Sequence, residues 1–131
     1  MAVTPNSKVT EQTPTTIVGQ VATSDQTTAS AMGTATTNGR KIFKVLVFPG
    51  ASDREIGFWD YDGSNAREVC LVDITADAAA DIVPVDILAN VPLPVDENGN
   101  KYYPLAAGHT VYMSGEDVAQ TNDVSIPCWD Y

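Results

Sequence analysis

The residues of this chain that could support catalysis are few and isolated. The only histidine is His109, which follows a glycine in an expected corner, and no nucleophile motif such as G-x-S-x-G accompanies it. Carboxylates are abundant enough for a general acid–base pair, but most lie in expected turns, where Asp is common for backbone reasons. We therefore interpret His109 as a turn residue and predict a non-enzymatic protein with no catalytic residues.

One segment has the residue types of a metal-binding loop. Residues Asp60–Asn65 read DYDGSN, and Asp-x-Asp-Gly is typical of calcium loops. An EF-hand loop requires a bidentate Glu at its twelfth position. Leu71 or Val69 would occupy that position, according to whether Asp60 or Gly63 sets the register. Neither supplies a ligand, so we predict a hairpin turn here, with no metal site and no cofactor.

The two cysteines and five of the aromatic residues each allow more than one interpretation. Cys70 and Cys128 lack C-x-x-C spacing and are too few for a disulfide framework. Buried free thiols are the favoured interpretation, with one bridge as the alternative. The aromatic side chains favour core or interface packing. The alternative is a carbohydrate platform built from two pairs, with Trp129 also available: Trp59 with Tyr61, or Tyr102 with Tyr103.

Composition divides the 131 residues into two parts. Eleven of the fourteen threonines lie at or before Thr37, whereas all ten aromatic residues lie at or after Phe43. The chain carries seven Lys+Arg against seventeen Asp+Glu, a net charge of −10. This charge repels phosphate backbones and anionic membranes, and no apolar run reaches the roughly 18 residues of a membrane span. We expect neither nucleic acid nor a membrane as partner, and the first residues lack the pattern of a secretory signal.

The leader, residues 1–40, has only four charges and no aromatic residue. Such a segment buries too little apolar surface to order alone. We predict an extended N-terminal arm whose apolar contacts to a partner are Ile17, Val18 and Val21. A strand at 16–24 folded back on its own domain is the alternative for part of it.

The body, residues 41–131, has the pattern of an all-β domain. Short β-branched and aromatic runs alternate with turn residues at roughly 8–12 residue spacing, which predicts an antiparallel β-sandwich or jelly-roll-like domain. Residues 75–88 are ambiguous, because three alanines favour a helical turn while Pro84 favours an extended edge piece. A further turn is predicted at 96–100. The expected strands are 42–48, 54–61, 66–74, 110–115 and 123–131.

Several short motifs occur in an order that is typical of one family. An N-G-R-K-I start at 38–42 is followed by the aromatic-D-G-x-N hairpin Tyr61–Asn65 and by a strand of the E-x-x-L-V-x-I kind. An L-x-A-G-x-x-V-Y segment covers 105–112, and the chain ends on Asp130-Tyr131. Over residues 38–131 the chain resembles small structural proteins encoded beside the capsid genes of tailed bacteriophages. It departs from their pattern in an inserted segment at 91–104.

This resemblance implies a capsid cement or decoration protein without catalytic activity. Its partners would be the major capsid protein and further copies of itself, and shell symmetry makes a homotrimer the expected oligomer. The location would be the capsid exterior of the virion, after assembly in the host cytoplasm. A tail, neck or fibre component is the alternative within the virion, and a carbohydrate-binding module is the alternative outside it.

Overall fold

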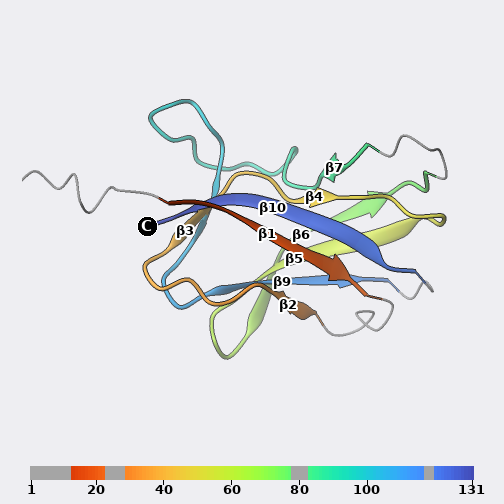
Figure 1. Ribbon diagram of the computed structural model, residues 1–131, viewed down its shortest axis with the longest axis horizontal. Coiled ribbons are helices and arrows are strands. Elements are labelled where there is room, and N and C mark those ends of the chain that lie inside the picture. Colours follow the sequence, from red (N-terminus) through yellow and green to blue (C-terminus); the bar gives the residue numbers. More distant parts are fainter. Residues whose placement is uncertain (1–12, 23–28, 78–82, 117–119) are drawn as a thin grey trace, which may run out of the picture.

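The computed structural model describes residues 13–22, 29–77, 83–116 and 120–131. Within these ranges the chain forms β-strands and no helix, so the predicted all-β class is confirmed. The strands form two antiparallel sheets that pack face to face as a β-sandwich (Figure 1). The described residues include no helix long and apolar enough to cross a membrane.

The first sheet, here called the β10 sheet, is organised around the last strand. β10 (Asn122–Asp130) pairs over its whole length with β1 (Thr13–Val21), and Figure 1 shows the two strands side by side. The other side of β10 pairs in succession with β4 (Leu46–Val47) and β3 (Arg40–Ile42). Outside these lie β7 (Val85–Asp86), which pairs with β4, and β8 (Tyr103–Leu105), which pairs with β3.

The second sheet, the β9 sheet, has the order β2-β9-β5-β6. Its strands are β2 (Ser30–Met32), β9 (Thr110–Gly115), β5 (Arg54–Tyr61) and β6 (Ala66–Ile74). The predicted hairpin of β5 and β6 is confirmed. Its turn is closed by Asp62, whose Oδ1 accepts the N–H groups of Ser64 and Asn65 at 2.8 Å. These two hydrogen bonds lower the pKa of the Asp62 carboxyl below its ordinary value.

The run predicted as one strand at 42–48 is split in two, and its partner explains the split. The register between β10 and this run shifts by one residue: Cys128 lies opposite Ile42, and Val124, four residues earlier, lies opposite Val47, five residues later. One extra residue is therefore accommodated near Phe43, whose N–H donates to the carbonyl of Pro127 at 3.1 Å. Pro127 has no N–H to return, so the ladder is interrupted opposite it and a bulge forms.

The core lies between the sheets and draws on both. Its fully buried side chains include Ile42 and Ile126 from the β10 sheet and Phe58 and Met113 from the β9 sheet, all 0% exposed. In the regions predicted as turns, residues 97–99 turn as expected, and Asp96 Oδ1 accepts the N–H groups of Asn98 and Asn100 at 2.9 Å. Of the ambiguous segment 75–88, residues 78–82 lie outside the described residues, and 85–86 form a strand, in agreement with the extended alternative.

The boundary at residue 40 requires a correction. We predicted an arm over 1–40 and a sandwich over 41–131, but β1 and β2 are strands of the sandwich and each pairs with a strand from the end of the chain. The alternative of a strand folded back on its own domain therefore holds for 13–21. The physical reason is that Ile17 and Val21 bury apolar surface in the domain's own core. Residues 1–12 lie outside the described residues.

Candidate functional site

The three predicted contact residues lie on β1, but they do not face the same way. Ile17 is 9% exposed and Val21 is 0% exposed, whereas Val18 is 79% exposed. Side chains alternate between the faces of a strand, so Ile17 and Val21 face the core and Val18 faces the solvent. The expectation that all three contact a partner is therefore corrected: only Val18 is accessible.

The backbone of β1 adds groups that the sequence reasoning missed. The main-chain carbonyls of Asp123 and Pro127 in β10 accept hydrogen bonds from the N–H groups of Phe48 and Phe43, on the side of β10 away from β1. Backbone groups of successive residues point to opposite edges of a strand. The even-numbered residues of β10 consequently face β1, where they are registered against its odd-numbered residues. The N–H and C=O groups of the even-numbered residues Thr16, Val18 and Gln20 therefore point to the other edge of β1. No described strand pairs with this edge, which is here called the free edge of β1.

The two prolines of this strand pair agree with that assignment. Pro14 of β1 and Pro127 of β10 both occupy positions whose backbone groups point away from the partner strand. Neither proline removes a hydrogen bond between β1 and β10, which is where proline is tolerated in a sheet. Pro14 was the signal in the sequence that could have indicated which backbone groups of β1 point to its edge, because proline in a strand occupies positions whose N–H is not needed for pairing.

The free edge of β1 differs from the other long edge of the sandwich. Proteins protect exposed strand edges with charges, bulges or short length. β6 carries Arg67, Glu68 and Asp73 along its nine residues, and it has a register shift opposite Phe58 and Trp59. β1 is equally long, reads TPTTIVGQV and carries no charged residue. Among the described strands β1 is thus the long edge with least protection against pairing with another chain.

A second group of polar side chains meets at one end of the sandwich. The Asp60 carboxylate accepts a hydrogen bond from the Tyr103 hydroxyl at 2.6 Å, and it lies 2.6 Å from Nδ1 of His109. Asp60 and His109 are 15% and 28% exposed in their side chains. The His109 side chain therefore pairs with a carboxylate, although the sequence indicated only a turn residue. A hollow of about 330 Å³ adjoins these three residues.

This group joins strands and has no nucleophile. Asp60 is the last inward-facing residue of β5, Tyr103 is the first residue of β8, and His109 immediately precedes β9. Tyr103 also packs edge to face on Phe58, with ring centroids 5.5 Å apart. Burial raises the pKa of the Tyr103 hydroxyl above its ordinary value, and the hydrogen bond to Asp60 raises it further. The arrangement therefore holds the Tyr103 proton and ties the two sheets together.

This raised pKa predicts a pH-dependent contribution of Tyr103 to stability. Above about pH 10 the unfolded chain releases the tyrosine proton while the folded chain retains it. The folded state then binds more protons, so the free energy of unfolding decreases as pH rises. Tyr103→Phe should lower the free energy of unfolding by about 1–2 kcal/mol near neutral pH. In denaturant titrations from about pH 8 to 11, we expect this difference from wild type to shrink; a constant difference would contradict the assignment.

The aromatic pairs considered for carbohydrate binding have different surroundings. Trp59 and Tyr61 share the outer face of the β9 sheet, where Trp59 Nε1 donates to Ser114 Oγ at 2.8 Å and Tyr61 stacks on Tyr112 at 4.3 Å. The Lys41 ammonium group lies over the Tyr102 ring, 4.9 Å from its centroid, whereas Tyr103 is half-buried and packs against the core on Phe58. Tyr102 and Tyr103 therefore cannot form one platform.

Neither cysteine is in a disulfide, as favoured from the sequence. Burial raises the pKa of both the Cys70 and the Cys128 thiols to about 11. A thiol needs a lowered pKa to act as a nucleophile at neutral pH, so both thiols pack as small apolar side chains. Within the described ranges no three His, Cys, Asp or Glu side chains cluster closely enough to hold a metal ion.

Comparisons with known proteins add no information about these surfaces. No protein-family model, no curated protein and no solved structure matches the chain significantly.

Proposed function

We propose that the protein is a non-enzymatic virion structural protein, a capsid decoration protein that binds the major capsid protein through the free edge of β1. The edge supplies the N–H and C=O groups of Thr16, Val18 and Gln20. A strand of the shell subunit adds to it by main-chain hydrogen bonds, and the exposed Val18 side chain contributes apolar contact.

The observation that carries the proposal is the length of this edge without a charge. β1 has nine residues without a charge, and after Pro14 its edge offers N–H and C=O groups for pairing. A protein that must remain soluble would keep such a template for a partner. The net charge of −10 keeps free copies apart. Together these features favour a protein that is soluble alone and adds to a preformed assembly, as the resemblance to phage head proteins implies. Homotrimers on the shell are part of the same proposal.

Two adjacent threonines provide a matched test of edge pairing. Thr16→Pro removes an N–H that points to the free edge, and Pro14 already occupies an equivalent position two residues earlier. We expect this variant to fold normally and to bind at least tenfold more weakly to empty capsids assembled from the major capsid protein of the same genome. Thr15→Pro removes an N–H directed at β10, so it should instead lower the free energy of unfolding by about 1–3 kcal/mol.

The two readouts separate the possible failures. Co-sedimentation with capsids measures binding, and denaturant titration measures folding. If Thr16→Pro binds capsids as tightly as wild type, the β1 edge is not the contact. If wild type does not bind capsids but labels the tail or neck of purified virions, the alternative location within the virion replaces the head.

A further inference from the structure

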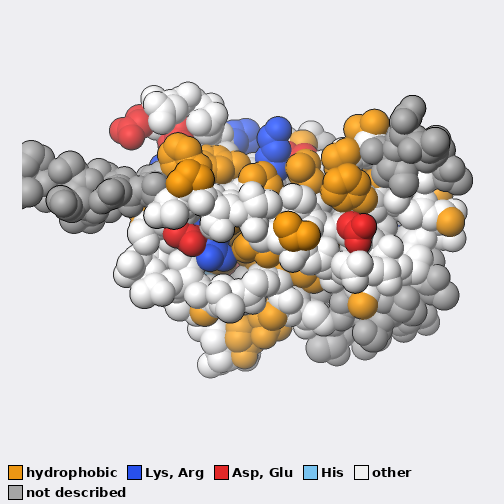
Figure 2. Space-filling model, viewed as in Figure 1, with side chains coloured by type: hydrophobic (Ala, Val, Ile, Leu, Met, Phe, Trp, Pro, Cys, Tyr) orange, Lys and Arg blue, Asp and Glu red, His pale blue; other side chains and the backbone are white. Residues whose placement is uncertain are grey.

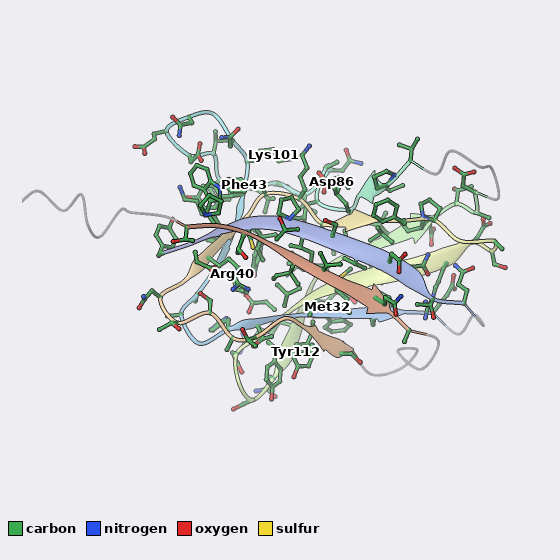
Figure 3. The ribbon with its side chains drawn as sticks, in the orientation of Figure 1. Met32, Arg40, Phe43, Asp86, Lys101 and Tyr112 are labelled. Carbon is green, nitrogen blue, oxygen red and sulfur yellow. The ribbon has the colours of Figure 1, made fainter. Side chains whose placement is uncertain are left out.

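A cavity of about 530 Å³ opens on the outer face of the β10 sheet, away from the free edge of β1. It lies between the turn at 87–90 and the loop that ends at Lys101. Figure 3 shows Phe43, Lys101 and Asp86 together above β10. The volume is within the range of small-molecule sites, about 300–1,000 Å³.

Two aromatic rings form one wall of this cavity. Phe43 and Trp129 are half-buried, with ring centroids 5.4 Å apart and planes at 82°. Trp129 belongs to β10, and Phe43 occupies the bulge opposite Pro127 that separates β3 from β4. The interruption of the strand ladder therefore places an aromatic ring beside the tryptophan on a solvent-facing surface.

Basic side chains are concentrated here although the protein is strongly acidic. Three of the cations in the described residues are buried: Arg40, Lys41 and Arg54. The exposed cations of those residues are Arg67, Lys44 and Lys101, and the two lysines both line the cavity. In Figure 2, Lys and Arg side chains appear beside hydrophobic ones at the upper rim of the molecule. A pocket that collects positive charge on a chain of net charge −10 is complementary to an anion.

The polar wall is held in place by hydrogen bonds. Asp86 Oδ1 accepts the N–H groups of Val45 and Leu88, both at 3.1 Å. Lys101 Nζ donates to the carbonyl of Ala89 at 3.0 Å, which joins the two sides of the cavity. The site is therefore formed before any ligand arrives, which reduces the entropic cost of binding.

We propose that this cavity binds an acidic sugar, a uronic acid residue at the end or within a polysaccharide. The C–H face of the pyranose ring packs on Trp129 and Phe43. The sugar carboxylate pairs with the Lys44 and Lys101 ammonium groups, and Asp86 accepts from a ring hydroxyl. This binding is independent of the proposed capsid attachment, because it uses the outer face of the β10 sheet and none of the β1 groups.

Other anionic ligands fit the cavity less well. A phosphate group would bring a charge approaching −2 beside the Asp86 carboxylate. The Phe43 and Trp129 rings are nearly perpendicular, so a nucleobase could stack on one ring but could not be sandwiched between the two. Turns border this cavity, so an extended acidic peptide could not add to it as a strand.

The test uses the full chain carrying Trp59→Phe, so that Trp129 is the sole tryptophan. Galacturonic acid trimer is titrated while Trp129 fluorescence is followed, with isothermal calorimetry as a second readout. We expect saturable binding that Lys44→Gln and Lys101→Gln each weaken about tenfold. Galactose trimer, which lacks the carboxylates, should also bind about tenfold more weakly. Arg67→Gln is the matched control, since Arg67 is 77% exposed in its side chain on the other sheet.

Each remaining outcome would overturn the proposal. Absence of saturable binding at millimolar trimer would remove the site. Equal affinity for the neutral trimer would remove the role of the lysines. If Arg67→Gln weakened binding as much as the two lysine variants, the trimer would be attracted to exposed cations in general and not to this cavity. Displacement of the sugar by inorganic phosphate or by a polyglutamate peptide at lower concentration than free uronate would assign the cavity to that ligand class.

Discussion

Arg54→Met is expected to lower the free energy of unfolding by about 3–5 kcal/mol, the range for breaking a buried charged network. Arg54 is 1% exposed at the start of β5. Methionine fills a similar volume without a charge. The variant thus retains most of the packing and removes the five hydrogen-bonding N–H groups.

The cost comes from the groups that Arg54 satisfies. Its guanidinium donates to main-chain and side-chain oxygens at the ends of three other strands, which it draws together at one end of the sandwich. Methionine cannot donate to these oxygens, and the bonds to Val21 O and Asn122 Oδ1 lie in the buried interior, where the loss of a hydrogen bond to a charged donor costs about 1–3 kcal/mol. The acceptors are Ala22 O at 2.8 Å, Gln120 O at 3.0 Å, Val21 O at 3.1 Å, and Glu116 O and Asn122 Oδ1 at 3.2 Å.

Two further variants make this expectation specific to the hydrogen bonds. Arg67→Met removes an exposed arginine and should change the free energy of unfolding by less than about 0.5 kcal/mol. Arg54→Lys keeps the charge but loses the planar fork of donors, so its stability should fall between those of wild type and Arg54→Met. Urea titrations of the three variants are the measurement. A loss below about 1 kcal/mol in Arg54→Met would contradict the role assigned to this residue.

The strands that the sequence predicted best are those whose pattern is local. The hairpin of β5 and β6 has alternating apolar residues and an Asp-Gly turn, and β9 occupies the predicted residues 110–115. Alternation identifies a half-buried strand from its own residues. The interruption at Phe43 was not predicted, because its cause is Pro127, which is 84 positions later in the chain.

The candidate site depended on contacts that no local pattern records. All three residues were assigned to a partner because their low-complexity surroundings resemble a disordered arm, but Ile17 and Val21 are buried and Val18 alone is exposed. An apolar stripe does not reveal whether it is buried against its own domain or against another chain. The contacts of Asp60 with Tyr103 and His109 span 43 and 49 residues, and neither distance corresponds to a sequence motif.

A pair of alanine substitutions on β1 tests whether this strand belongs to the folded domain. Ile17→Ala should lower the free energy of unfolding by about 2–4 kcal/mol, because it removes buried methyl and methylene groups and leaves a cavity. Ile17 packs against Gly33: its Cδ1 and Cγ2 atoms lie 3.4 Å from the point that a Cβ atom on Gly33 would occupy. Val18→Ala truncates the adjacent side chain, which is 79% exposed, and should change stability by less than about 0.5 kcal/mol.

The contrast between these neighbours is what separates a strand from an arm. If residues 13–21 were an arm that folds only on a partner, neither substitution would alter the stability of the free protein, and both would weaken capsid binding. In the sandwich, Ile17→Ala should lower the urea midpoint, and under the proposed function Val18→Ala should weaken capsid binding alone. Truncations distinguish the two possibilities in the same way. Removing residues 1–12 leaves β1 in place. Removing residues 1–40 deletes β1 and β2 and exposes the paired edge of β10, so the shortened chain should not fold.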